Sequence, residues 1–254
     1  MQQYFIENIS NKILFNDEQA HHIKNVMRMK ENEIVKVVDE NENAALVTIH
    51  YESKQVFGLL KEMIIDDGNS NINIYLGMAL IKKDKWEFCV QKACETGAYE
   101  ILPFVSSRCV VKITDEKNDK KIDRWQKIAS EACEQSKQNH LCTIHDILSY
   151  DEICKLDFDL KLIAYENADK IANNLASVCV NHPNARNILV LIGPEGGFSE
   201  SEVSKALSNG FICVSLGKSI LRAETAAISA INMLTYHYDI LGDKYGIIEK
   251  VNED

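Results

Sequence analysis

The chain has 254 residues, of which 46% are hydrophobic and 26% charged, and its formal net charge is -10. This length and composition favour a globular α/β protein with room for two units, and they argue against a disordered or membrane-spanning chain. The first residues lack the basic flank and the continuous apolar run of a signal peptide, so we expect a cytoplasmic protein.

The first 70 residues are expected to form a small β domain. A helical pattern spans residues 17–29, "DEQAHHIKNVMRM", and Asp17 is placed to cap it. Within it His21 and His22 point about 100° apart, which suits surface or capping roles and not a shared metal ion. The polar stretch 65–71, "IDDGNSN", is expected to be a linker. Strands are predicted at 33–39, 44–51 and 55–64.

Residues 71–254 alternate between strand and helix patterns. The predicted strands are continuous apolar runs, which indicates a parallel sheet covered by helices on both faces. Strands are expected at 72–80, 100–105, 160–165, 187–192 and 211–216, and helices at 83–97, 123–136 and 226–241. The last helix has apolar residues on more than one face, which favours a partner chain or burial within one chain.

The eight cysteines are scattered through the second part of the chain. No C-x-x-C pair occurs and no histidine lies at ligand spacing, so we expect reduced thiols in the core, without a bound metal.

Glycine is concentrated in "LIGPEGGFSE", residues 191–200, directly after an apolar strand. Open α/β sheets bind ligands at the carboxyl ends of their strands, where Gly193, Gly196 and Gly197 would let a ligand approach the backbone. The following "SESE" is typical of a helix capping box. A tight strand-to-helix turn is the simpler alternative, while the spacing excludes a P-loop and a dinucleotide-binding fingerprint.

A second loop, "LGKSILRAETA" at 216–226, also follows a predicted strand and opens a helix. Arg222 and Glu224 lie at this helix entrance, either as pocket residues or as a surface ion pair. Because parallel strands end at one edge of the sheet, the two loops are expected to form one pocket.

Together these two loops resemble the signature loops of SPOUT-type methyltransferases, which bind S-adenosylmethionine (SAM) in a trefoil-knotted parallel sheet. The segments "HHIKNVMRM", "ALIKKDKWEFCVQKACETGAYEILPFVSSRCVVK" and "RWQKIASEACEQS" are similar, in order and over almost the full length, to RsmE-type 16S rRNA uridine-N3 methyltransferases. This resemblance implies a PUA-like β-barrel domain for RNA binding at 1–70. It also implies a SPOUT domain at 71–254 and a homodimer acting on 16S rRNA of the small ribosomal subunit.

The resemblance assigns roles to individual residues. Arg222 is expected to stabilise a uracil anion, and Glu224 to orient Arg222 or to take the proton. Tyr165 and Glu166 are weaker candidates. The residues expected to hold SAM are Ile192, Gly193, Gly197, Leu216, Gly217, Ile220 and Leu221. The residues expected to contact RNA are Arg28, Lys82, Lys92, Arg108 and Arg124.

The distribution of charge is compatible with an RNA partner. Residues 82–137 hold 12 basic and 10 acidic residues, a net charge of +2 within an acidic chain. The chain departs from the family where basic residues or proline are usual, at Gln2, Gln3, Gln138, His140 and Cys142. The alternatives left open are a SPOUT enzyme acting on another RNA or on a ribose hydroxyl, and a non-catalytic RNA-binding protein.

Overall fold

The computed structural model describes residues 1–53, 55–65, 72–110, 118–165 and 173–240. The chain forms two compact units, of which the first comprises Met1–Asn69 and Ser130–Leu141 and the second Ser70–Ala129 and Cys142–Asp254. Residues 130–141, which we expected in the second unit, are thus grouped by their contacts with the first. Most of the expected linker at 65–71 lies outside the described residues.

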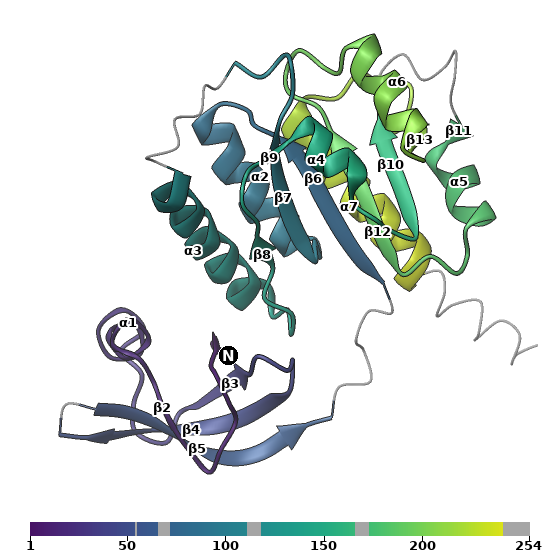
Figure 1. Ribbon diagram of the computed structural model, residues 1–254. Helices are drawn as coiled ribbons and strands as arrows, with labels where there is room; N and C mark the ends of the chain where they lie inside the picture. Colours follow the sequence, from purple (N-terminus) through teal and green to yellow (C-terminus); the bar gives the residue numbers. More distant parts are fainter. Residues whose placement is uncertain (54, 66–71, 111–117, 166–172, 241–254) are drawn as a thin grey trace, which may run out of the picture. The chain divides into compact units, whose positions relative to one another are not determined.

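The first unit is a five-stranded sheet with the order β1-β3-β4-β5-β2 (Figure 1). Its neighbouring strands are antiparallel, apart from β1, which runs parallel to β3. The apolar side chains of alternating strand positions pack with Tyr4 and Ile23 into one core. The strands are β1 (Gln3–Phe5), β2 (Lys12–Leu14), β3 (Ile34–Val38), β4 (Ala44–Glu52) and β5 (Gln55–Ile64).

The helical segment of this unit begins differently from the prediction. Helix α1 (Asp17–His21) is capped by Asn16, not by Asp17: the Asn16 side chain accepts from the Gln19 amide, and the Gln19 side chain accepts from the Asn16 amide. Asparagine is a strong N-cap residue, and Gln19 completes the capping box. A π-helical turn, η1 (His22–Val26), follows, in which the Met27 amide donates to His22.

The second unit is built on an eight-stranded sheet with the order β11-β13-β10-β12-β6-β7-β8, with β9 paired to β7. All its described strand pairs are parallel, which confirms the predicted parallel sheet. The short strands β8, β9 and β11 were not predicted. The strands are β6 (Asn73–Ala79), β7 (Glu100–Val105), β8 (Thr143–Ile144), β9 (Leu148–Ser149), β10 (Leu160–Ala164), β11 (Asn173–Asn174), β12 (Asn187–Ile192) and β13 (Ile212–Ser215).

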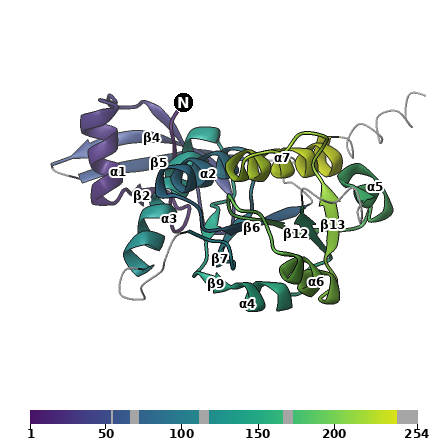
Figure 2. The same cartoon turned by 90° about the horizontal axis from the view of Figure 1, so that it is seen from above.

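Helices cover both faces of this sheet, with α2 and α7 on one face and α4 and α6 on the other (Figure 2). Because α7 packs against α2, β6 and β12, its first residues lie near the carboxyl ends of the central strands. None of the helices in the described ranges is long and apolar enough to cross a membrane. The helices are α2 (Lys83–Glu95), α3 (Asn118–Ser136), α4 (Tyr150–Lys155), α5 (Leu175–Asn181), α6 (Glu200–Ser208) and α7 (Ala223–Thr235), which continues as the π-helix η4 (Tyr236–Ile240).

None of the eight cysteines forms a disulfide in the described parts of the chain, and seven of them are buried. The expected position of the thiols in the core thus holds for all but Cys109, which is partly buried. In the apolar layer between sheet and helices, Cys154 and Cys213 pack with Phe104, Ile153, Leu191 and Phe198.

Candidate functional site

A pocket of about 510 Å³ lies at the carboxyl edge of the parallel sheet. The ends of β10, β12 and β13 and the first turns of α2 and α7 all contribute to it. This is the edge at which open α/β sheets bind ligands. It brings together the two sequence motifs, which we call the glycine loop (residues 193–199, after β12) and the α7-entry loop (residues 216–222, after β13).

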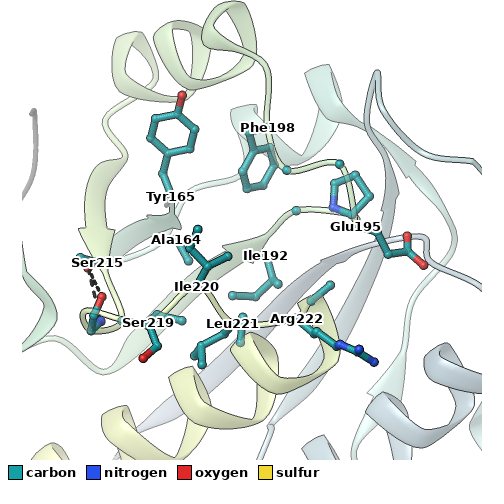
Figure 3. A pocket seen from close by; sticks show the side chains of 18 of the residues that line it. Ala164, Tyr165, Ile192, Glu195, Phe198, Ser215, Ser219, Ile220, Leu221 and Arg222 are labelled. Carbon is teal, nitrogen blue, oxygen red and sulfur yellow. Dashed lines mark hydrogen bonds between the residues drawn. The ribbon is translucent and has the colours of Figure 1, made fainter. Parts of the chain in front are cut away.

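All the residues that we expected to hold the cofactor line this pocket, and so do Arg222 and Tyr165. Figure 3 shows the side chain of Ile192, at the end of β12, together with those of Ile220 and Leu221 from the α7-entry loop. In the same view Arg222 and Glu195 lie at one end of the pocket and Ser215 and Ser219 at the other. Glu166 lies outside the described residues.

The glycine loop needs residues without side chains at two points. A β-carbon on Gly193 would lie 3.2 Å from two ring atoms of Phe198, which is itself buried. Gly197 has φ 65°, a conformation that other residues adopt at a cost, and its amide donates to Pro194 at 2.9 Å. The tight turn is therefore real, and it exposes backbone to the pocket as well.

The segment after β7 holds the glycine loop in place. Arg108 Nη1 donates to the carbonyl oxygens of Gly196 at 2.9 Å and Phe198 at 3.2 Å. Glu202 accepts from the Ser107 amide at 2.7 Å and, through the predicted capping box, from the Ser199 amide at 2.9 Å. Burial acts to raise the pKa of Glu202, but these hydrogen bonds outweigh it and the pKa is lowered. A carboxylate in its charged form thus anchors one end of the loop.

The α7-entry loop is more open. The Ser215 hydroxyl contacts the Gly217 amide and carbonyl at 3.3 Å and 3.0 Å, and Ile220 is 85% exposed. Arg222 is the N-cap of α7, and its carbonyl accepts from the Ala226 amide at 2.7 Å. Its exposed guanidinium makes no hydrogen bond or ion pair within the described ranges, so it is available to a ligand.

Glu224 does not line the pocket and forms no ion pair with Arg222 in the structure. Residues two apart on a helix do not face each other. The Oε1 atom of Glu224 lies instead 3.9 Å from Nζ of Lys85, a pocket residue that the sequence reasoning missed. The signal available was "KKDKW", a basic run at the start of a helix that follows a central strand.

The five residues expected to contact RNA come from separate elements of the two units. Arg28 is exposed in the first unit, after η1, and Lys82 is exposed at the N-cap of α2. Lys92 pairs with Glu95 at 2.7 Å, and Arg124 makes two hydrogen bonds of 2.8 Å to Glu87. Arg108 contacts the glycine loop, as described above.

Three of the departures from the family pattern lie in hydrogen bonds inside the first unit. The buried Gln3 donates from Nε2 to the Gln138 carbonyl at 2.6 Å. His140 Nδ1 lies 2.8 Å from Glu42 Oε1. These contacts hold residues 130–141 to β1 and to the turn between β3 and β4, a structural role that no pattern in the sequence indicated.

Within the residues that the structure describes, no group of three or more His, Cys, Asp or Glu side chains is arranged to hold a metal ion. The two adjacent histidines make separate contacts, since Asn25 Nδ2 lies 2.8 Å from His21 Nδ1 and the Tyr4 hydroxyl 3.0 Å from His22 Nδ1.

Both units are similar to domains of known proteins. Residues 68–235 match the model of an RNA methyltransferase domain, and residues 15–57 match that of an RNA methyltransferase PUA domain. The chain is 34% identical over 256 residues to the ribosomal RNA small subunit methyltransferase E of Bacillus subtilis. That alignment covers 96% of this chain and 100% of the relative.

Two solved structures share the fold over nearly the whole chain. A ribosomal RNA small subunit methyltransferase E from Neisseria gonorrhoeae, bound to SAM, has a TM-score of 0.85 and 30% identity, over 94% of this chain and 98% of that one. A Legionella pneumophila protein solved in complex with SAM has a TM-score of 0.82 and 28% identity, over 92% of this chain and 96% of that one.

Proposed function

Since the chain belongs to the family of ribosomal RNA small subunit methyltransferases E, and is therefore a SAM-dependent methyltransferase of 16S rRNA, we propose that it methylates N3 of one uridine in that RNA. The observation that carries this proposal is the pocket at the carboxyl edge of the sheet. The glycine loop lines it, and so does Arg222, whose side chain has no partner among the described residues. The glycine loop provides a site for the cofactor, and the arginine provides a charged group that can contact the uracil.

The pocket fits SAM in size and in chemistry. Its volume of about 510 Å³ lies in the range usual for small-molecule sites. Gly193, Gly197 and Gly217 present backbone groups, while Ile192, Ile220 and Leu221 offer apolar surface to an aromatic base. With SAM bound, this site supplies an electrophilic methyl group on a sulfonium sulfur, and the protein's part is to align it with the target atom.

Arg222 is placed to help remove the proton from N3 of uracil, the atom that receives the methyl group. The N3–H group of uracil is a weak acid, so at neutral pH the nitrogen that receives the methyl group is mostly protonated. Loss of the proton to water leaves negative charge on the two carbonyl oxygens beside N3, and a nearby guanidinium stabilises that charge. The planar, permanently charged arginine suits two neighbouring acceptors better than lysine does. We therefore assign Arg222 as a catalytic residue.

The RNA itself is proposed to contact the basic residues of both units. We assign residues 1–70 as the PUA-like RNA-binding domain and 71–254 as the catalytic domain. Lys92 and Arg124 are paired with carboxylates, but exposed ion pairs contribute little and exchange readily for phosphate. Arg108 has further donors beyond the Nη1 atom that contacts the glycine loop. The RNA contacts are Arg28, Lys82, Lys92, Arg108 and Arg124.

We further propose that the protein acts as a cytoplasmic homodimer through α7 and η4. Ala227, Ala230, Ile231 and Leu234 are buried, yet Met233 and Tyr236 are 41% and 54% exposed on the same helical segment. A second apolar face at the surface favours a partner. Sedimentation at micromolar concentration tests this: a dimer is expected, and a monomer would refute it.

Mapping of modified uridines tests the proposed reaction. The 16S rRNA of a strain that lacks this gene is expected to lose one N3-methyluridine, and the wild-type gene is expected to restore it. An Arg222→Ala gene is expected to restore little of it. An unchanged set of N3-methyluridines in the deletion strain would refute the proposed target.

A further inference from the structure

Lys85 occupies a distinctive place in the first turn of α2. It lines the pocket and its side chain is 30% exposed, whereas Lys83 in the same turn is 73% exposed and lies 3.9 Å from Glu87. Lys218, a second lysine of the pocket, is exposed on the α7-entry loop. Lys85 therefore brings a partly desolvated positive charge to the pocket from a helix, which is a more rigid support than a loop.

The carboxylate next to Lys85 is unusual. The Glu224 side chain is only 13% exposed, and Oε2 is fully buried with no hydrogen-bond partner among the described residues. Oε1 lies 3.9 Å from Lys85 Nζ, which is beyond the range of a hydrogen bond. Burial and the charge of Glu224 raise the pKa of the Cys89 thiol to about 12, so this neighbour stays protonated. A buried carboxylate with a free oxygen is costly and calls for an explanation.

We propose that Lys85 is a second catalytic cation of the pocket, and that Glu224 acts as the positioning residue that holds it there. This inference rests on the proposed methylation of uracil. The ion pair restricts where the ammonium group of Lys85, a pocket residue, can lie. Because the pair has no hydrogen bond, the three N–H donors of the ammonium group stay available. The N3 proton of uracil goes to water.

The geometry gives Lys85 and Arg222 complementary tasks. Negative charge on a deprotonated uracil is shared by the two carbonyl oxygens that flank N3, so two cations from different elements can each face one of them. Arg222 comes from the N-cap of α7 and Lys85 from the first turn of α2, and these helices pack against each other. Glu224, which does not line the pocket, affects the base through Lys85 alone.

Single-turnover methylation of small ribosomal subunits tests this assignment, with SAM affinity measured separately by calorimetry. At saturating SAM, Lys85→Ala is expected to lower the rate about 100-fold, as for loss of one preorganised donor. The dissociation constant for SAM should stay within about twofold, and Lys85→Arg should recover part of the rate because the charge is kept. The control is Lys83→Ala, in the same turn but outside the pocket, with an expected wild-type rate.

A double-mutant comparison tests the role of Glu224. Glu224→Gln is expected to lower the rate about 10-fold, and to have no further effect in the Lys85→Ala background, because residues that act as one unit are not additive. Full additivity would show that Glu224 reaches the base itself, and would overturn the positioning role.

Other outcomes would overturn the proposal for Lys85. A wild-type rate for Lys85→Ala would remove it from the reaction. A loss of SAM affinity as large as the loss of rate would instead assign the ammonium group to the carboxylate of the cofactor. Failure of the wild-type protein to methylate small subunits would contradict the proposed function, and that result is visible before any variant is compared.

Discussion

The two loops of the pocket differ in how the rest of the protein holds them. The glycine loop is fixed from several sides, by Arg108 at two carbonyls, by Glu202 at its end and by the buried ring of Phe198. The α7-entry loop is held more loosely. Among the described residues, its hydrogen bonds ahead of α7 are those between Ser215 and Gly217. The first loop is already built for a ligand, whereas the second offers exposed side chains.

This difference suggests a division of labour between affinity and turnover. A loop whose backbone is already positioned pays little to bind, which suits the cofactor. Side chains that lack protein partners can reserve their interactions for the charge that develops on the base. Substitutions in the glycine loop should therefore change cofactor affinity, and loss of the Arg222 side chain at the end of the α7-entry loop should change the rate.

The largest effect is expected at Arg222. Arg222→Ala should lower single-turnover methylation by ~10²- to 10³-fold, because a preorganised donor to the uracil anion is lost. SAM affinity should barely change, and Arg222→Lys should restore the rate in part. The matched control is Arg186→Ala, at the opposite edge of the sheet, just before β12. Equal rates for Arg222→Ala and the wild type would contradict the proposal that Arg222 acts on the rate of methylation.

A valine at Gly197 should act on affinity. The branched side chain would stand at φ 65°, where it is strained and faces the pocket, so SAM binding should weaken by at least ~10-fold, or about 1.4 kcal/mol. Gly210→Val is the control, because Gly210 has φ 83° and lies outside the pocket. Both variants should lose similar stability, as measured by urea unfolding. Calorimetry showing equal SAM affinity for the two variants would remove the glycine loop from the site.

The hydrogen bonds from Arg108 to the glycine loop provide a second test of how the two loops differ. Arg108→Ala deletes two hydrogen bonds to loop carbonyls, and we expect SAM affinity to fall about fivefold, or about 1 kcal/mol. Arg124→Ala removes an exposed arginine that pairs with Glu87, so it should leave SAM affinity unchanged. If calorimetry shows the same affinity for both variants, Arg108 does not preorganise the loop.

The smallest effect concerns Glu202 and stability. Its pKa is lowered in the folded protein, so its contribution is present above the usual pKa of a glutamate and is lost as the pH falls through the lowered value. Glu202→Gln should cost about 1 to 2 kcal/mol at neutral pH through weaker hydrogen bonds to Ser107 and Ser199. Urea unfolding should show that the difference in free energy of unfolding between the wild type and Glu202→Gln becomes smaller as the pH is lowered from about 7 to about 3. A difference that stays the same over this pH range would contradict the anchoring role of Glu202.

Most of the second unit could be predicted from the sequence. Continuous apolar runs such as "NILVLI" belong to strands buried on both faces, and the capping box at Ser199 is a local signal that needs no tertiary information. The short strands β8, β9 and β11 could not be predicted, because each has two residues and a pair of residues shows no hydrophobic periodicity. Asn16 was passed over as a cap in favour of its acidic neighbour, although Gln19 marks it.

The candidate site was predicted where one loop carries its own signal. Glycine at a strand end and arginine at a helix entrance are readable in sequence. Contacts between distant segments are not, which is why the interaction of Arg108 with Gly196 and that of Lys85 with Glu224 came from the structure alone. In both cases a basic residue makes a contact with a residue more than 80 positions away in the sequence.

One measurement tests the central claim most directly. Purified protein is incubated with small ribosomal subunits and saturating SAM in a single turnover, and the modified nucleoside and its position are then identified. We predict N3-methyluridine at one position, formed by the wild-type protein and nearly abolished by Arg222→Ala. Methylation of a ribose hydroxyl, or the absence of methylation on any ribosomal RNA substrate, would contradict the account.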